Sequence, residues 1–330
     1  MTTRNATMRA LRQATLAGPD DLHLVTDVPV PAPGAGEILV RVTAAGVNFA
    51  DVMQGHGTYG GGPRAPYLAG FEAAGEVVAL GDGVAGPPVG ARVVGAGPGA
   101  FAEYVAMPAV SAVRVPPDWA DEQALGLVLN WATALAALKP LGRVGAGETV
   151  VIHAAAGGVG QAAVRLAKHY GATVVGVAAR DKHDVVRALG ADHVLDRTAD
   201  VTAEVLRLTA GAGADLVLES AGGSGFAAGL AATRRVTGRV VVYGLAGGEA
   251  PVTNADLVFR HQIQLIGLHI GVLAGAAPDV FAWLIGELHA LIAAGVYPPG
   301  APAVHDLADG PKVLAQLAAG STTGKLALRP

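Results

Sequence analysis

One carboxylate in the first third of the chain lies in surroundings that call for an explanation. The stretch AGFEAAGEVV, residues 69–78, places Glu72 among alanines and glycines, directly after Phe71. Short side chains on both sides indicate that other backbone packs closely against this segment, and a charged group rarely lies in such surroundings without a partner. Three roles fit such a carboxylate: a metal ligand, a catalytic acid or one half of a structural ion pair.

The strongest chemical signal is a glycine-rich turn between an apolar strand and a helix, in TVVIHAAAGGVGQAAVRLAKHYGA, residues 149–172. Two glycines stand at the second and third positions of the dinucleotide-binding pattern GxGxxG, where they let a pyrophosphate approach the backbone and let helix and strand pack closely. Exposed N–H groups and the helix dipole then favour an anion. An ordinary tight turn is the alternative, but the strand–turn–helix context favours a nicotinamide-cofactor site. The predicted site consists of Ala155 (in place of the first glycine), Gly157, Gly158, Val159 and Gly160.

The end of the second strand, VAARDK at residues 177–182, distinguishes NADH from NADPH. Sites that prefer NAD carry an acid there, about 20 residues after the glycine turn, to hold the ribose 2′-OH. Here two alanines occupy the position, and Arg180 with Lys182 could neutralise a 2′-phosphate. Asp181 is predicted instead to be the N-cap of the next helix, with Asp184 in a capping-box-like arrangement. The sequence therefore predicts NADPH.

The elements that position these groups differ between the two halves of the chain. Up to about residue 120, short apolar runs separated by clusters such as PAPGAG and GDGVAGPP are typical of an antiparallel, barrel-like β domain. From residue 148 onward strands and helices alternate, which predicts a doubly wound parallel sheet of the Rossmann type. The predicted strands are 38–42, 75–80, 91–94, 101–105, 149–153, 173–177, 193–195, 215–218, 239–243 and 263–268, and the predicted helices include 159–170, 184–189 and 279–294.

The last part of the chain is too short to form a core of its own. A long helix, a short strand, a second helix and the terminal strand GKLALRP complete it, and we expect this tail to return to the first domain. The predicted domains are therefore 1–123, 124–268 and a C-terminal segment 269–330.

Composition excludes several classes of protein. With 330 residues, 52% hydrophobic and 15% charged, the chain has a large interior, and its 47 glycines favour tight α/β packing. The absence of cysteine removes disulfides, thiolate nucleophiles and cysteine-based zinc sites. A net charge of -4 gives no electrostatic reason to expect nucleic-acid binding.

No part of the sequence indicates a membrane protein. The most apolar stretch, ALGLVLNWATALAAL at residues 124–138, is too short to cross a bilayer and is predicted to be a buried helix. MTTRNATMRALRQ lacks the apolar region of a secretory signal. We therefore expect a cytoplasmic protein whose partners are small molecules, with no membrane or nucleic-acid partner.

Three motifs occur in a specific order: VNFAD, GFEAAGEV and HAAAGGVG. Together with the barrel, the Rossmann domain and the returning tail, they resemble the medium-chain dehydrogenase/reductase superfamily over essentially the whole chain. The closest branch is that of the zinc-independent quinone oxidoreductases, which includes zeta-crystallin. The resemblance implies an α/β protein with a GroES-like antiparallel β-barrel as catalytic domain and a Rossmann domain that binds NADPH.

Zinc members of this superfamily bind the metal through a Cys in the first motif, the His of a Gly-His-Glu triplet and a later Cys. This sequence has Asn48 and Phe71 at the first two positions, and the third falls near Asn130. The four-cysteine lobe for structural zinc is also missing. Asn and Phe cannot replace Cys and His on zinc, so no metal site is expected.

The loss of the metal ligands changes the roles of their neighbours. Phe71 is expected to line an apolar wall near the nicotinamide. Glu72 stands where zinc enzymes also keep a Glu, so we expect a structural carboxylate paired with an Arg, either Arg92 or an Arg of the cofactor domain.

The chemistry expected of such a site is reduction of conjugated carbonyls. Without a Lewis acid, an alcohol or simple ketone is poorly polarised, whereas hydrogen-bond donors can stabilise the charge that a quinone or enone develops. The resemblance likewise implies NADPH-dependent reduction of quinones or α,β-unsaturated carbonyls. An enoyl-thioester or polyketide-intermediate reductase and a non-catalytic NADPH-binding protein are the alternatives.

The resemblance also assigns roles to individual residues. Asn48 matches an active-site Asn that contacts substrate oxygen or nicotinamide, although a turn-forming Asn would fit the same position. Tyr59 is expected near the substrate as a hydrogen-bond or proton donor, and Met53 replaces a second Tyr of many relatives, which implies a more apolar pocket. Thr133 is expected beside the nicotinamide or packed within its helix. Lys325 is expected to reach the NADP phosphate.

The remaining predictions concern the cofactor domain. Arg197 follows the third strand, where some relatives place a Tyr against the adenosine phosphate, and Tyr243 with Gly244 ends the fifth strand, where the Rossmann crevice opens. His153 is expected to be a buried histidine with one hydrogen bond. HQIQLIGLHIGV, residues 261–272, is predicted to form an edge strand, and since exposed edges invite pairing, we expect a homodimer.

Overall fold

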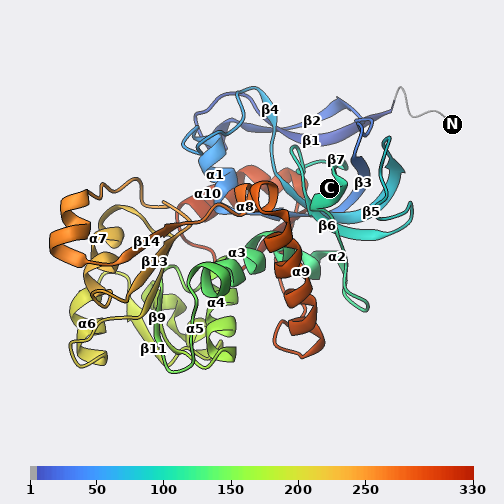
Figure 1. The fold of residues 1–330 in the computed structure, drawn as a ribbon. Helices are drawn as coiled ribbons and strands as arrows, with labels where there is room; N and C mark the ends of the chain where they lie inside the picture. The colour runs from blue at the N-terminus through green and yellow to red at the C-terminus, as the bar shows by residue number, and fades with distance from the viewer. Residues whose placement is uncertain (1–5) are drawn as a thin grey trace. The chain divides into compact units, whose positions relative to one another are not determined.

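The computed structural model describes residues 6–330 and divides into two compact units, which are coloured by residue number in Figure 1. The first unit consists of Met1–Leu129 and Pro299–Pro330, and the second of Asn130–Pro298. Residues 1–5, which the first predicted domain includes, lie outside the described residues. The units thus divide the chain at 129/130 and 298/299, whereas the predicted boundaries were 123/124 and 268/269.

Helices α8 (Ile270–Ala276) and α9 (Pro278–Ala293) account for the larger difference, because they belong to the second unit. The apolar face of α9 is buried, and α9 packs against helix α3 (Ala132–Ala136) of the same unit. At the two ends of this unit, the rings of Trp131 and Tyr297 stack with centroids 3.6 Å apart. The predicted tail therefore splits, and only its last part belongs to the first unit.

The first unit is built on sheets that are antiparallel, as the alternating apolar runs predict, except for one parallel pair of strands, β15 with β16. One sheet has the order β15-β16-β3-β5-β6-β8 with β7 paired to β3, and a smaller one has the order β2-β1-β4. The strands are β1 (Thr7–Gln13), β2 (Leu22–Pro29), β3 (Glu37–Val47), β4 (Tyr67–Leu68), β5 (Glu72–Leu80), β6 (Arg92–Ala96), β7 (Tyr104–Pro108), β8 (Val113–Arg114), β15 (Ala303–Asp306) and β16 (Leu326–Arg329). The helical elements are α1 (Phe49–Gly55), α2 (Asp121–Ala124), α10 (Gly310–Ala318) and the short turns η1 (Pro19–Asp21), η2 (Ala109–Ser111) and η7 (Leu307–Asp309).

The predicted strand at 101–105 begins three residues later, as β7. Residues 101 and 103 bond to β1 instead: the N–H of Leu11 donates to the carbonyl of Phe101, and the N–H of Glu103 donates to that of Arg9. Phe101 is fully buried in the core of the unit. Its apolar character is therefore explained by packing against β1 and not by membership of β7.

Close backbone packing around AGFEAAGEVV is confirmed. A Cβ at Gly75 would lie 2.0 Å from the carbonyl oxygen of Arg41 on the neighbouring strand β3. A Cβ at Gly46, also on β3, would lie 2.2 Å from Oε2 of Glu72. Glycine at both positions lets β3 and β5 approach each other while the buried carboxylate lies against the backbone.

The end of the chain returns to this sheet, as expected. Strand β16 pairs antiparallel with β3, and Leu326 lies opposite Val47. This register places Lys325, one residue before the strand, beside the segment that leads from β3 into α1.

The second unit is a parallel six-stranded sheet in the order β11-β10-β9-β12-β13-β14, the doubly wound arrangement predicted (Figure 1). Its strands are β9 (Thr149–Ile152), β10 (Thr173–Ala178), β11 (His193–Asp196), β12 (Leu216–Glu219), β13 (Arg239–Val242) and β14 (Gln264–Gly267). The connecting helices are α4 (Gly158–His169), α5 (His183–Ala188), α6 (Val201–Leu208) and α7 (Gly223–Ala232), with the shorter elements η5 (Arg180–Lys182) and η6 (Asp256–His261). The central strands are rich in valine and buried, as parallel strands covered on both faces must be.

The apolar stretch 124–138 is helical, as predicted, but it is not one regular α-helix. Two π-helical segments, η3 (Leu127–Trp131) and η4 (Ala137–Leu141), flank α3. Among the described residues, the largely helical stretch Asp121–Leu141 is long and apolar enough to be tested as a membrane span, and 67% of its most apolar window is buried. Such burial is typical of a core helix.

Candidate active site

The glycine turn of the second unit has the geometry expected of a phosphate cradle. Gly157 is the N-cap of α4, and its N–H donates to the carbonyl of Ala154 at 2.9 Å. A Cβ at Gly160 would lie 2.3 Å from that same oxygen and 2.7 Å from Cα of Ala155, so helix and turn can approach only through a glycine. A Cβ at Gly157 would meet nothing closer than 3.3 Å. The fold itself therefore requires Gly160, whereas the glycine at 157 leaves space beside the turn.

The other residues predicted for the cofactor follow the carboxyl ends of neighbouring strands. Arg180 and Lys182 follow β10, Arg197 follows β11, and Tyr243 with Gly244 follows β13. Because parallel strands end at one edge of the sheet, these residues follow the same edge as the cradle. The N–H of Arg197 donates to the carbonyl of Ala178, which ties the second and third strand ends together.

The strand end at Arg180 differs from prediction in two respects. Asp181 is not the N-cap of α5: it lies in the turn η5, and Lys182 occupies the N-cap position. The chain makes one 3-10 turn before the helix, which displaces the cap by a residue. Arg180 also has a carboxylate partner that sequence reasoning missed, Asp196 at the end of β11, with Nε and Oδ2 3.3 Å apart.

Asp196 remains ionised over the physiological pH range. Hydrogen bonds from the hydroxyl and N–H of Thr198, with a contribution from Arg180, lower the pKa of its carboxyl to about 2. The side chain of Arg180 is 87% exposed, so it can leave this carboxylate for a phosphate at little cost. The adjacency of residues 180 and 196 could not be derived from spacing alone, since it depends on the order of the strands.

His153 is buried at the end of β9, as predicted, and Glu219 at the end of β12 is its ion-pair partner, but Nε2 of His153 has no hydrogen-bond partner among the described residues. Nε2 of His153 lies 3.5 Å from Oε2 of Glu219, whose side chain is fully buried. Burial lowers the pKa of His153, although the charge of Glu219 acts in the opposite direction. The other oxygen of Glu219 accepts hydrogen bonds from the N–H groups of Ala221 and Gly222, so this carboxylate organises the loop after β12.

In the first unit, Glu72 is fully buried and its partners define a compact polar cluster. Oε2 lies 2.5 Å from Nζ of Lys325 and accepts from Nδ2 of Asn48 at 3.0 Å, and Oε1 accepts from the N–H of Gly126 at 2.5 Å. We refer to Asn48, Asp51, Glu72 and Lys325 as the polar cluster. Of the three roles considered for Glu72, the structure shows the ion pair.

The expected arginine partner of Glu72 is wrong. Arg92 donates to Oδ1 of Asp121 at 2.7 Å and to the carbonyl of Trp119 at 2.6 Å. In the β5–β6 register, Ala96 lies opposite Glu72 and Arg92 lies four residues further along, roughly 13 Å at the rise of a strand. The cation comes instead from the terminal strand.

Lys325 is saturated by protein acceptors. Its ammonium donates to the carbonyl of Val47 at 3.2 Å, to Oδ1 of Asn48 at 2.8 Å and to Glu72 at 2.5 Å. An ammonium has three protons, and each has an acceptor here. The expected contact with the phosphate of NADP would require one of these bonds to break.

Asn48 has the turn-forming role, and its amide also belongs to the polar cluster. It is the N-cap of α1, where its backbone N–H donates to Oδ2 of Asp51 at 2.8 Å, which is the turn-forming role. Its amide meanwhile joins the polar cluster: Nδ2 donates to Glu72 at 3.0 Å and to the carbonyl of Gly46 at 3.2 Å.

Asp51 is the member of the cluster that sequence reasoning missed, although it belongs to the VNFAD motif. Burial raises the pKa of its carboxyl from 3.8 to about 8, with Lys325 lowering it and Glu72 raising it.

Burial, followed by the charge of Asp51, raises the pKa of Tyr59, which keeps that phenol protonated. Met53 lies half-buried on α1, and Phe71 is half-buried just before β5.

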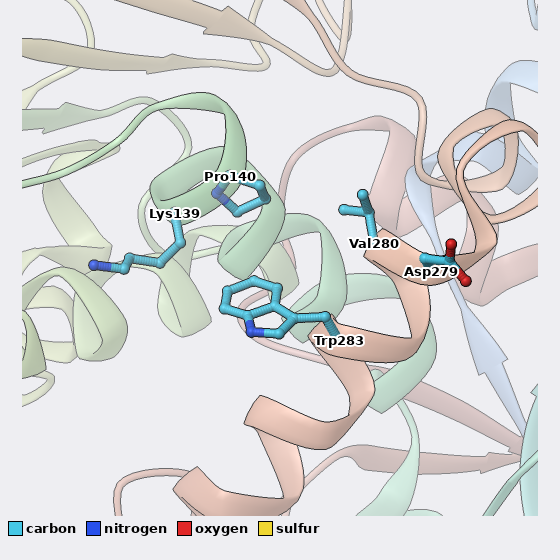
Figure 2. A pocket seen from close by; sticks show the side chains of 5 residues that line it. All are labelled: Lys139, Pro140, Asp279, Val280 and Trp283. Carbon is cyan, nitrogen blue, oxygen red and sulfur yellow. The ribbon is translucent and has the colours of Figure 1, made fainter.

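An open hollow of about 470 Å³ lies elsewhere on the second unit, between η4 and α9 (Figure 2). Trp283 reaches from α9 toward the helix of Lys139 and Pro140, while Asp279 lies on the other side. No residue predicted for the cofactor or substrate lines it.

Thr133 is buried within α3.

The side chains at positions 48 and 71, where zinc members of the superfamily carry metal ligands, do not suit zinc. Asn48 offers an amide bound to Lys325 and Glu72, and Phe71 offers no donor atom. Within residues 6–330, no three His, Asp or Glu side chains are grouped so that they could hold a metal ion.

Two family models match the chain. "Alcohol dehydrogenase GroES-like domain" matches residues 34–117, within the first unit, and "Zinc-binding dehydrogenase" matches residues 158–287, within the second. The human synaptic vesicle membrane protein VAT-1 homolog is 32% identical over 320 residues, which cover 91% of this chain and 80% of that protein. A mycocerosic acid synthase-like polyketide synthase of Mycobacterium tuberculosis is 37% identical over 300 residues, but the chain spans only 14% of its length.

Solved structures agree with these matches. A mycobacterial structure complexed with NADPH has a TM-score of 0.92 at 32% identity and covers 98% of this chain and 100% of that one. The quinone oxidoreductase of Pseudomonas syringae has a TM-score of 0.90 at 31% identity, with coverage of 98% and 100%.

The barrel-like sheet, the doubly wound sheet with its glycine cradle and these matches define the class: the chain belongs to the medium-chain dehydrogenase/reductase superfamily of oxidoreductases. Within that superfamily it belongs to the branch resembling the zinc-independent quinone oxidoreductases.

The cradle glycine gives a first test. Because the Cβ of Gly160→Ala would collide with the carbonyl of Ala154, the turn must move, and we expect the affinity for NADPH, used as probe, to fall about tenfold or more. Gly286→Ala on α9, where a Cβ meets open space, is the matched control. Fluorescence titration of both variants measures the effect. Equal affinities would show that the turn at 160 does not shape the cofactor site.

The buried carboxyl of Asp51 gives a pH-dependent test. Its pKa is raised in the folded state, so its contribution to stability is complete below about pH 4 and is lost progressively as the pH rises toward 8. We expect Asp51→Asn to remove a few kcal/mol of this pH dependence, since one pKa unit corresponds to about 1.4 kcal/mol. Denaturant unfolding between pH 4 and 8 measures it, with the exposed Asp118→Asn as control. Parallel curves for wild type and Asp51→Asn would contradict the burial effect.

Proposed function

We propose that this protein reduces quinones or α,β-unsaturated carbonyls by hydride transfer from NADPH, without a metal. The observation that carries the proposal is the first unit's site, where an amide held between Lys325 and Glu72 replaces a metal ligand. A donor of this kind can stabilise the oxygen of a conjugated acceptor but cannot act as a Lewis acid on an alcohol.

The cofactor proposal rests on the second unit. Cradle residues 155–160 favour a pyrophosphate, and Arg180 and Lys182 follow β10, where a 2′-phosphate would need a cation. Two structural neighbours, the mycobacterial one and the Escherichia coli quinone oxidoreductase, were solved in complex with NADPH. Arg197, Tyr243 and Gly244 at the same edge complete the proposed site.

The protein's part in the reaction is to bind, orient and stabilise. NADPH, when bound, supplies the hydride that adds to the β-carbon or quinone ring. Negative charge then develops on the substrate oxygen, where Asn48 and Tyr59 are the proposed hydrogen-bond donors. Burial raises the pKa of Tyr59 above its ordinary value of 10, so the phenol is protonated and can donate a hydrogen bond, and the proton comes from Tyr59 or from water. Met53 and Phe71 are the proposed apolar contacts of a flat substrate.

A second candidate is reduction of enoyl thioesters. The polyketide synthase match covers 90% of this chain, and a CurK enoyl reductase structure has a TM-score of 0.87 at 26% identity, with coverage of 98% and 99%. The two candidates differ in substrate and share the hydride chemistry.

A screen for substrate-dependent NADPH oxidation tests these functions together. We expect turnover of simple 1,4-quinones or enones with NADPH and at least tenfold lower kcat/KM with NADH, since the small residues and cations after β10 favour a 2′-phosphate. Turnover confined to pantetheine enoyl thioesters would establish the second candidate. NADPH binding without oxidation in any reaction would instead indicate a non-catalytic nucleotide-binding protein.

The proposed assembly is a cytoplasmic homodimer formed through strand β14. This strand lies at the edge of its sheet, as predicted. The N–H groups of Gln264 and Leu268 donate inward to β13, so by alternation those of Leu265 and Gly267 point outward along the edge.

Gly267→Pro tests the assembly without breaking the inward bonds. Proline at 267 removes one outward donor and blocks pairing of the edge, and a Cβ there meets open space. We expect the variant to sediment as a monomer in analytical ultracentrifugation, while Gly267→Ala, which keeps the N–H, remains a dimer. A monomeric wild type, or a dimeric Gly267→Pro variant, would refute pairing through this edge.

A further inference from the structure

We propose that Lys325 is a positioning residue: it acts with Glu72 to hold the Asn48 amide in the single orientation that presents an N–H to the substrate oxygen. The proposal rests on the reductase function above and assigns Lys325 a role at the reacting end of the site in place of the expected phosphate contact. Lys325 donates to Oδ1 of Asn48 at 2.8 Å, and Glu72 accepts from Nδ2 at 3.0 Å.

The charges on either side of the amide determine which way it faces. The two ends of an asparagine amide have nearly the same shape but opposite hydrogen-bonding character. If the amide of Asn48 turned over, its NH2 group would face the ammonium of Lys325 and its oxygen would face the carboxylate of Glu72. Both contacts would be repulsive in a buried setting where the carboxylate is fully buried and the lysine side chain only 12% exposed.

One N–H of this amide can exchange its protein acceptor for an acceptor on a ligand. Of its two bonds, the one to Glu72 is shorter and charge-assisted, and the one to the carbonyl of Gly46 is longer, at 3.2 Å. A substrate carbonyl can therefore replace Gly46 as acceptor while Lys325 and Glu72 keep the amide in place. The arrangement supplies a donor whose direction is set before substrate binds.

The returning tail fixes the position of the ammonium. Residue 325 precedes β16, whose first residue lies opposite Val47 on β3, and the carbonyl of Lys325 accepts from the N–H of Ala303. The backbone of Lys325 is thus held on both sides. The three protons of its ammonium are all donated to acceptors of the first unit.

A spectroscopic experiment tests the orientation without requiring activity. The chain contains four asparagines, so selective labelling with [15N]asparagine gives few side-chain NH2 signals, and loss of one pair in Asn48→Ala identifies that of Asn48. We expect Lys325→Met to shift or broaden this pair, Lys325→Arg to retain most of its position, and the exposed Lys312→Met to leave it unchanged. An unchanged pair in a folded Lys325→Met variant would overturn the proposal.

A double variant guards against loss of folding, because Lys325→Met leaves Glu72 buried and unpaired. Lys325→Met with Glu72→Gln removes both charges together, and the proposal predicts that the Asn48 signals move in this variant as well. Unmoved signals in a folded double variant would show that the two charges do not hold the amide.

Steady-state kinetics separates positioning from phosphate binding. If Lys325 positions Asn48, Lys325→Met lowers kcat about 10- to 100-fold with NADPH and NADH alike and leaves the KM for NADPH within about threefold. Lys325→Arg should recover part of kcat. A rise in the KM for NADPH with unchanged NADH turnover would overturn the proposal and restore the phosphate role. If no substrate is turned over at all, the proposed function fails, and the NMR result still decides the role of Lys325.

Discussion

The arrangement of the first unit depends on one buried ion pair, Lys325 with Glu72. Its carboxylate is fully buried, and a buried charge is tolerated only when an opposite charge and further hydrogen bonds satisfy it. The two residues are 253 positions apart, and the whole second unit lies between them in the sequence. The pair joins the sheet core to the terminal strand, and the amide of Asn48 is oriented as a consequence.

In the second unit, the proposed phosphate site depends on the backbone of the glycine turn and not on a buried charge. Gly160 is required by contacts inside the protein, because a Cβ would strike the turn that precedes it. Gly157 is not so constrained, and the space beside it is what a phosphate would need. The same motif thus contains one glycine that the fold requires and one that leaves space where the phosphate is proposed to bind.

The structural features that the sequence predicted correctly are those set by residues close together in the chain. The strand–turn–helix of residues 149–172 and the strands of the parallel sheet follow from apolar periodicity and glycine placement, which act over a few residues. The partner of Glu72 was wrong because it depends on the register of β5 with β6 and on the path of the tail. Asp196 beside Arg180 was missed for a similar reason, since strand order brings them together. Asp51 was missed because burial of a motif residue is a tertiary property.

Charge balance in the polar cluster bears directly on the proposed reduction. The cluster contains two carboxyls, Asp51 and Glu72, but a single ammonium. Because burial raises the pKa of Asp51 to about 8, that carboxyl holds a proton at pH 7, and Lys325 and Glu72 cancel each other. The cluster is then neutral, and negative charge developing on a substrate oxygen near Asn48 meets no net repulsion from it. Protonation of Asp51 therefore removes one source of repulsion from the proposed reduction, while Lys325 and Glu72 orient the amide.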